Sequence, residues 1–209
     1  MKNKMIYVHG KNGTAKESRH YEVLFPEYDV IGFDYKSETP WAAQDEFRSF
    51  LASLNVEYGN VAVIANSIGA FFTMCALGDK RMEKAYFISP IVNMERLIAD
   101  MMVWCGISES ELKVKGTINT SFGEKLSWEY LSWVKKNSIS WNTPTAILYG
   151  ADDKMQSLET VRIFADKNKA DVTVMENGEH WFHTEEQMAF LDNWIQKANP
   201  HGRDSRDMS

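Results

Sequence analysis

Three residues whose side chains together could cleave an acyl bond, Ser67, Asp153 and His180, each follow a short apolar run. A serine hydroxyl becomes a strong nucleophile when a histidine removes its proton and a carboxylate orients that histidine. In chain order these residues are a serine, an acid and a histidine, and each stands just after a predicted strand. These three residues are therefore the first candidates for catalysis.

The residues around Ser67 have the pattern of a tight turn between a strand and a helix. An apolar run over 60–66 is typical of a strand buried on both faces, and 71–77 favours a helix. Small residues two before and two after the serine, Ala65 and Gly69, allow neighbouring backbone to pass closely. Such a turn strains the serine backbone, exposes its hydroxyl and leaves the N–H of Ile68 at a helix start. The alternative is that Ser67 only caps the helix.

Six short apolar segments are predicted strands, and helical patterns separate most of them. The segments are 5–8, 28–35, 60–66, 84–88, 145–149 and 171–175. This alternation predicts an α/β fold with a mostly parallel central sheet of about six strands and helices on both faces. The carboxyl ends of parallel strands open on one shared edge, so the side chains that follow these strands are expected to meet there.

Helix-start signals support this division of the chain. Thr39 and Pro40 are typical of an N-cap and a first helical position, and Thr184 with Gln187 predicts a capping box at the last helix. Residues 1–198 are expected to form a single domain, and the polar stretch 199–209 a disordered tail.

The segment 91–142 leaves the alternating pattern and is predicted to be a small helical lid insertion. Asn93 can cap a first helix, Ser108 with Glu111 indicates a second capped start, and 126–134 favours a third helix. Its Met and Trp side chains could line a pocket for an apolar substrate. Packing in the core explains most of the same residues, and both interpretations stay open.

Composition excludes several classes of function. The chain has 209 residues and a net charge of −6 at pH 7, and it has no block of Lys and Arg, which argues against a nucleic-acid partner. No apolar run reaches membrane-spanning length, and the first residues do not form a targeting segment. Cys75 and Cys105 are too few for a disulfide framework, so we expect free thiols in a reducing cytoplasm. No cofactor and no metal site are expected.

The chain resembles the α/β-hydrolase-fold serine hydrolases, as a compact, esterase-like member, over roughly residues 5–198. The residues that carry the resemblance are His9-Gly10-Lys11, Ala65-Asn66-Ser67-Ile68-Gly69, Gly150-Ala151-Asp152-Asp153 and Gly178-Glu179-His180-Trp181. The resemblance implies that Ser67 is the nucleophile, His180 the general base and Asp153 the acid. It also implies that the backbone N–H groups of Lys11 and Ile68 form the oxyanion hole.

The resemblance is incomplete at two points. Ala65 replaces the glycine most often found at the first elbow position, and the earliest strands of the family are missing. The Lys11 ammonium could also meet a substrate carboxylate or point to solvent.

Each catalytic assignment has a rival. Asp152 is the alternative acid and His183 the alternative base, while His9 is expected to brace its turn. A metal site from His180 and His183 is a weaker idea, because no third acidic ligand stands at a recognised spacing.

The sequence thus predicts a serine hydrolase that cleaves carboxylic esters of small, apolar acyl or aromatic substrates through an acyl-enzyme. A thioesterase, a lipase-like enzyme or an acyltransferase would use the same triad. A ligand-binding protein that keeps the fold without catalysis is the alternative from another class. The oligomeric state is left undetermined.

Overall fold

The computed structural model describes residues 2–199, so the predicted disordered tail lies outside the described residues apart from Asn199. Asn199 is buried, and its side-chain amide donates to Glu27 Oε1 at 2.7 Å. The chain divides into two compact units, Met1–Val92 with Ser140–Ser209 (the sheet unit) and Asn93–Ile139 (the insertion unit). The insertion unit falls inside the predicted 91–142 segment.

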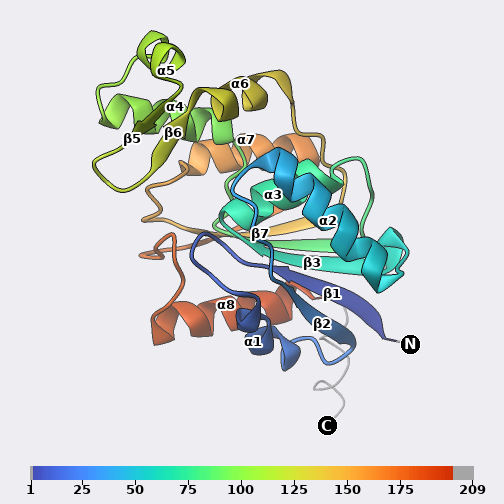
Figure 1. Cartoon of the computed structure of the whole chain (residues 1–209). Helices are drawn as coiled ribbons and strands as arrows, with labels where there is room; N and C mark the ends of the chain where they lie inside the picture. Colours follow the sequence, from blue (N-terminus) through green and yellow to red (C-terminus); the bar gives the residue numbers. More distant parts are fainter. Residues whose placement is uncertain (1, 200–209) are drawn as a thin grey trace. The chain divides into compact units, whose positions relative to one another are not determined.

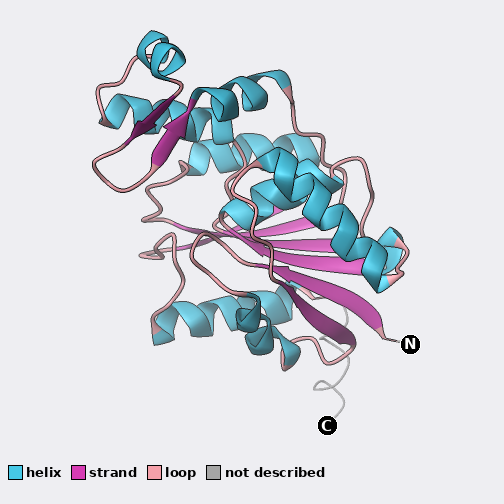
Figure 2. Cartoon of the chain, viewed as in Figure 1, coloured by secondary structure: helices cyan, strands magenta, loops and turns pink. Residues whose placement is uncertain are grey.

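Six strands of the sheet unit form one sheet in which every neighbouring pair is parallel (Figures 1 and 2). The strands are β1 (Asn3–Val8), β2 (Tyr28–Phe33), β3 (Val61–Asn66), β4 (Lys84–Ile88), β7 (Thr145–Gly150) and β8 (Asp171–Met175). Their spatial order is β2-β1-β3-β4-β7-β8. The α/β fold with six strands is thereby confirmed.

The burial of each strand follows from its place in this order. The central strands β3, β4 and β7 are buried along almost their whole length. The edge strands β2 and β8 are only partly buried. A strand covered on both faces needs an apolar run, and this explains why the central strands were visible in the sequence.

Helices cover both faces of this sheet (Figure 1). One face carries α1 (Ser18–Glu22) and α8 (Glu185–Ala198), and the other carries α2 (Pro40–Leu54), α3 (Ile68–Leu77) and α7 (Leu158–Asn168). Two short 3₁₀ turns, η1 (Ala15–Glu17) and η2 (Tyr58–Asn60), complete the unit. The core under α1 and α8 is rich in aromatic side chains, among them Tyr7, Tyr86 and Trp194.

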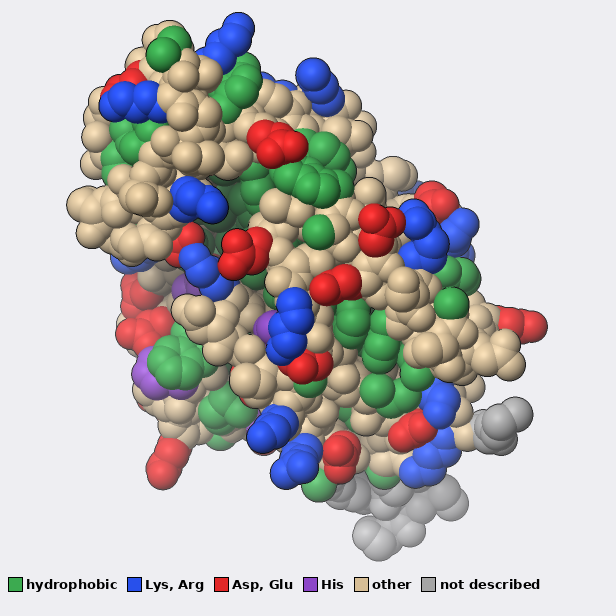
Figure 3. Space-filling view, viewed as in Figure 1, with side chains coloured by type: hydrophobic (Ala, Val, Ile, Leu, Met, Phe, Trp, Pro, Cys, Tyr) green, Lys and Arg blue, Asp and Glu red, His purple; other side chains and the backbone are tan. Residues whose placement is uncertain are grey.

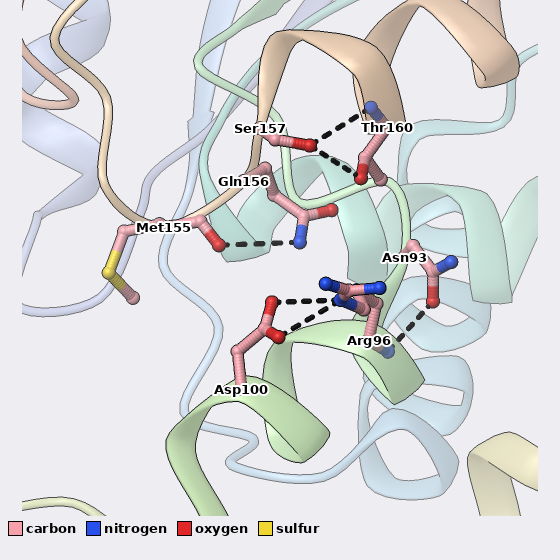
Figure 4. A network of polar contacts seen from close by, with 7 residues as sticks. All are labelled: Asn93, Arg96, Asp100, Met155, Gln156, Ser157 and Thr160. Atoms are coloured by element: carbon pink, nitrogen blue, oxygen red, sulfur yellow. Dashed lines mark hydrogen bonds and ion pairs between the residues drawn. The ribbon is translucent and has the colours of Figure 1, made fainter. Parts of the chain in front are cut away.

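Side-chain caps begin several helices, as their sequences indicate. Asn93 Oδ1 accepts from Arg96 N at 2.9 Å, and elsewhere Ser157 Oγ accepts from Thr160 N at 3.2 Å (Figure 4). These contacts satisfy backbone N–H groups that have no partner inside the helix.

The capping box predicted at the last helix is only half correct. Thr184 Oγ1 accepts from Gln187 N at 3.2 Å, as expected. The Gln187 side chain instead accepts from the backbone of His183, one residue earlier, at 3.1 Å. The amide side chain therefore closes the turn before the helix rather than the cap residue itself.

The insertion unit contains a two-stranded hairpin that the sequence did not predict. Its elements are α4 (Met94–Trp104), α5 (Glu109–Lys115), β5 (Thr117–Asn119), β6 (Lys125–Ser127) and α6 (Trp128–Lys136). β5 and β6 pair antiparallel, and Gly123 turns the chain between them with φ +86°. Leu126, predicted within the third helix, lies in β6. Strands of three residues are too short for a period-two pattern to stand out.

The surface carries both signs of charge. Figure 3 shows Lys and Arg interspersed with Asp and Glu over the face in view, in keeping with the absence of a Lys and Arg block in the sequence. In the part of the chain that the structure describes, none of the helices has the length and apolar character needed to cross a membrane.

Candidate active site

The turn between β3 and α3 holds Ser67 in a strained conformation. Ser67 has φ +51° and ψ −121°, a region that residues other than glycine rarely adopt. Neighbouring backbone fixes it there: Ser67 N donates to Ile88 O at 3.0 Å, and Ile91 N donates to Ser67 O at 3.1 Å. Strain maintained by surrounding structure is common where a side chain must be presented for chemistry.

Gly69 is required at this turn by close backbone contact. A Cβ at position 69 would lie 2.4 Å from the carbonyl oxygen of His9 and 2.8 Å from that of Val8. The β1 end therefore passes against the first turn of α3 at a distance that only glycine allows. Ala65, the other small residue of the motif, is fully buried in β3.

The Ser67 hydroxyl faces a histidine and not the helix. Its Oγ lies 2.8 Å from His180 Nε2, and the Ser67 side chain makes no cap hydrogen bond to α3. The helix-cap interpretation of Ser67 is therefore wrong. β3 and the loop between β8 and α8, which are far apart in sequence, bring the two side chains together.

His180 is oriented from its other side by Asp153. His180 Nδ1 lies 2.7 Å from Asp153 Oδ2. A carboxylate can only accept, so this contact assigns the proton to Nδ1 and leaves the Nε2 lone pair directed at Ser67. The imidazole is a quarter exposed, which leaves it accessible to a substrate.

Asp153, and not Asp152, is the acid that contacts the histidine. The Asp153 side chain is 1% exposed, and its second oxygen accepts from Met155 N at 2.7 Å. Asp152 is exposed, and its backbone N–H donates to Gly178 O at 2.8 Å. In the loop after β7, the Asp153 carboxylate therefore points inward to His180. The backbone of Asp152 contacts the loop that carries His180.

Close backbone packing also joins the acid loop to the histidine loop. A Cβ at Gly150 would lie 2.4 Å from Gly178 O and 2.5 Å from Glu179 O. Next to this contact, burial and then the charge of Asp153 raise the pKa of Tyr149 to about 12. The Tyr149 hydroxyl is thus a neutral donor, and it donates to Gln156 O at 2.8 Å.

The rival base, His183, is engaged elsewhere. Its Nδ1 lies 2.7 Å from Trp181 O, and its ring stacks on the Trp181 indole with centroids 4.5 Å apart. Within residues 2–199, no group of three or more His, Cys, Asp or Glu side chains is arranged to hold a metal ion.

Comparisons with known proteins place this architecture. No protein-family model matches the chain. Est1E from Butyrivibrio proteoclasticus superposes with a TM-score of 0.74 at 14% identity, over 94% of this chain and 87% of that one. Alpha/beta hydrolase domain-containing protein 10 from mouse gives 0.71 at 15% identity, over 95% and 91% of the two chains.

The chain has the α/β-hydrolase fold. An esterase from Pyrococcus furiosus agrees, with a TM-score of 0.59 at 17% identity over 94% of this chain and 80% of its own. A second structure of Est1E holds ferulic acid. A Mycoplasma genitalium protein named as an esterase/lipase is 31% identical over 81 residues, which span 37% of this chain and 29% of that relative.

Two backbone N–H groups of this α/β-hydrolase fold are candidates for an oxyanion hole. Ile68 begins α3, where an N–H has no acceptor inside the helix. Lys11 lies in the loop after β1, and a Cβ on its neighbour Gly10 would come within 3.3 Å of Ser67 Cβ. The loop therefore runs directly beside the candidate nucleophile.

His9 lies under this loop. Its ring is buried and stacks on Tyr35 with centroids 4.3 Å apart, and its Nδ1 lies 2.8 Å from Gly10 O. Tyr35 OH donates to His9 O at 2.9 Å, and Gly13 N donates to Gly10 O at 3.1 Å. His9 thus braces its turn, as expected from the sequence.

The sequence did not predict the polar side chains that connect the segments next to the candidate catalytic loops. Tyr7, Asn66 and Gln156 all make buried or half-buried hydrogen bonds next to the candidate catalytic loops. Gln156 Oε1, for example, accepts from Val92 N at 3.2 Å. A tyrosine within an otherwise aliphatic strand, as at position 7, is the one signal that could have revealed them.

Proposed function

We propose that this chain is a serine hydrolase that cleaves carboxylic esters through an acyl-enzyme. Ser67 is the nucleophile, His180 the general base and Asp153 the acid that orients it. The observation that carries the proposal is the continuous hydrogen-bonded path from Ser67 Oγ through His180 to Asp153, with contacts of 2.8 and 2.7 Å. The esterase names of its structural neighbours support the same chemistry.

Acylation begins when His180 Nε2 takes the hydroxyl proton and Ser67 Oγ attacks the ester carbon. The carbonyl oxygen then carries a negative charge, which the N–H groups of Ile68 and Lys11 stabilise. Asp153 stabilises the imidazolium, and Nε2 returns the proton to the departing alkoxide. The products of this step are the acyl-serine and the free alcohol.

Deacylation repeats the sequence with water in place of serine. His180 removes a proton from the water, the hydroxide attacks the acyl carbon, and the second tetrahedral intermediate uses the same two N–H groups. Collapse of this intermediate returns the proton to Ser67 and releases the carboxylic acid. The geometry of one histidine between serine and acid suffices for both half-reactions.

Small esters with an apolar acyl or aromatic group are the proposed substrates. The ferulic acid held by Est1E supports an aromatic acyl group, and the Met- and Trp-rich insertion supports an apolar one.

The free thiols of Cys75 and Cys105 fit the expected cytoplasmic location. The role of the insertion as a lid stays a prediction.

The test is turnover of p-nitrophenyl acetate, a longer-chain p-nitrophenyl ester and methyl ferulate by wild type and Ser67→Ala. We expect turnover of at least one ester by wild type and none above the uncatalysed rate by Ser67→Ala. Ser53→Ala, which removes an exposed hydroxyl on α2, serves as the matched control and should keep full activity. Turnover that persists in Ser67→Ala, or a wild type that binds esters without cleaving them, would contradict the proposal.

A further inference from the structure

A line of polar side chains runs beneath the nucleophile turn and is not part of the proposed triad. Asn66 Nδ2 donates to the Tyr7 oxygen at 2.9 Å, and Tyr7 OH donates to Glu17 Oε2 at 2.5 Å. The other Glu17 oxygen accepts from Thr14 N at 2.7 Å. The line thus starts at Asn66 at the end of β3, passes through Tyr7 in β1 and ends at the backbone N–H of Thr14, in the loop after β1.

The phenol of Tyr7 is the buried centre of this line. Tyr7 is fully buried, and its ring stacks on Tyr21 with centroids 5.2 Å apart. Burial raises the pKa of Tyr7 far above its usual value, so the hydroxyl stays protonated and donates to the carboxylate. A buried hydroxyl loses its hydrogen bonds to water on folding and destabilises the protein unless it forms new ones.

Strand geometry explains why these side chains meet. Tyr7 pairs with Ile64 across the parallel β1 and β3 ladder, and residues 64 and 66 point to the same face of the sheet. Asn66 is the residue immediately before Ser67, and Thr14 closes the loop that contains Lys11. The line therefore ties together the two backbone segments proposed to supply the oxyanion N–H groups.

We infer that Tyr7, Asn66 and Glu17 form a positioning network for the oxyanion hole. The network holds the 9–14 loop at a fixed place relative to the nucleophile turn, so that the N–H groups of Lys11 and Ile68 reach the same oxygen. These side chains do not touch the substrate. This inference rests on the proposed function, because it concerns the same oxyanion.

Loss of the network should weaken stabilisation of the transition state, and so lower kcat, more than it weakens substrate binding. The loop has other attachments, such as the Tyr35 hydroxyl on His9 O, so it should stay folded but become less well placed. An oxyanion donor helps only when it lies at hydrogen-bond distance from the developing charge. Removing one such donor outright costs roughly 10²–10³-fold in kcat, and misplacing it should cost a fraction of that.

The principal variant is Tyr7→Phe, which removes the hydroxyl and keeps the ring. We expect kcat to fall about 10–100-fold, in line with a weakened oxyanion donor, while KM changes by less than about threefold. An aryl trifluoromethyl ketone, which forms a charged tetrahedral adduct with a serine, should lose affinity by the same factor as kcat. A merely structural role for Tyr7 would not link the adduct affinity to kcat in this way.

Tyr28→Phe is the matched control. Tyr28 is also a buried tyrosine, and its hydroxyl donates to Glu83 Oε1 at 2.7 Å, but it stands at the amino end of β2, away from the strand ends that carry the site. The Tyr28→Phe variant should lower the midpoint of unfolding, as Tyr7→Phe does, but its kcat should stay within about twofold of the wild-type value. Glu17→Ala, at a surface residue, breaks the same line without touching the core and should reproduce the Tyr7→Phe loss.

The outcomes separate the two proposals. If wild type turns over esters through Ser67 and both Tyr7→Phe and Glu17→Ala match Tyr28→Phe in kcat, the positioning network is refuted and the proposed function stands. A loss confined to KM would refute it equally. If wild type has no Ser67-dependent turnover, the proposed function fails, and this inference fails with it.

Discussion

Replacing Asp153 with asparagine should switch the tautomer of His180 without removing a contact. The amide nitrogen of the new side chain would face His180 Nδ1 and donate to it, while the amide oxygen could still accept from Met155 N, as Asp153 Oδ1 does now at 2.7 Å. The imidazole proton would then move to Nε2. In that tautomer Nε2 donates to Ser67 Oγ and cannot take its proton.

The expected loss is close to that of removing general-base catalysis. A change of the triad acid to its amide lowers kcat by about 10⁴-fold in a serine protease with the same arrangement. At 1.36 kcal/mol for each factor of ten, this corresponds to about 5.4 kcal/mol of transition-state stabilisation. Because the Met155 contact survives and the side chain keeps its size, the unfolding midpoint should change little.

The assay is steady-state hydrolysis of p-nitrophenyl acetate together with the rate of inactivation by a fluorophosphonate. Both rates report activation of Ser67, so both should fall in parallel in Asp153→Asn. Asp152→Asn is the matched control, because its side chain is exposed and is not the carboxylate that contacts His180, and it should keep more than half of the activity. Asp153→Asn activity above about a tenth of wild type, or an equal loss in Asp152→Asn, would refute the reasoning.

Two further predictions concern the packing around the site. Gly69→Ala should destabilise the fold by about 1–3 kcal/mol in denaturant unfolding, because the new methyl group would meet His9 O at 2.4 Å. Gly59→Ala, with nothing within 4 Å, should be close to neutral, and a stable Gly69→Ala would count against the close packing. Burial raises the pKa of Cys75 to about 12, so its thiol stays neutral and should react slowly with a disulfide reagent at about pH 8. In a Cys105→Ala background, unfolding with guanidinium should make that reaction fast, and an equally fast reaction in the native protein would contradict the prediction.

The sheet could be predicted from the sequence because its signals are local. The central strands β3, β4 and β7 are covered on both faces, and their apolar runs stand out against polar loops. The tight turn at Ser67 was recognisable from Ala65 and Gly69 for a similar reason, since close approach of backbone limits residue size. The structure then placed Ser67, His180 and Asp153 together at one edge of this sheet.

Elements without a clear local pattern were not predicted from the sequence. The β5–β6 hairpin consists of three-residue strands, and the helical segment formed by η1 and α1 has a mostly polar sequence. Leu126 lies in a strand because it pairs with Ile118 of β5.

Hydrogen bonds between residues far apart in the sequence could not be predicted either. The Asn66–Tyr7 contact joins residues 59 positions apart, and the Gln156–Val92 contact joins residues 64 apart. Each depends on the order of strands in the sheet, which a single sequence does not reveal. The sequence also left open which of Asp152 and Asp153 contacts His180, because the turn after β7, which buries the Asp153 carboxylate and exposes Asp152, leaves no signature in the sequence.

The central claim is that Ser67 is the nucleophile, and peptide mass spectrometry after treatment with a fluorophosphonate tests it most directly. We predict one covalent adduct per chain, located on Ser67, together with loss of ester turnover in proportion to labelling. Ser67→Ala should remain unlabelled under the same conditions. Labelling at another residue, or an intact wild type that loses no activity when Ser67 is modified, would contradict the account.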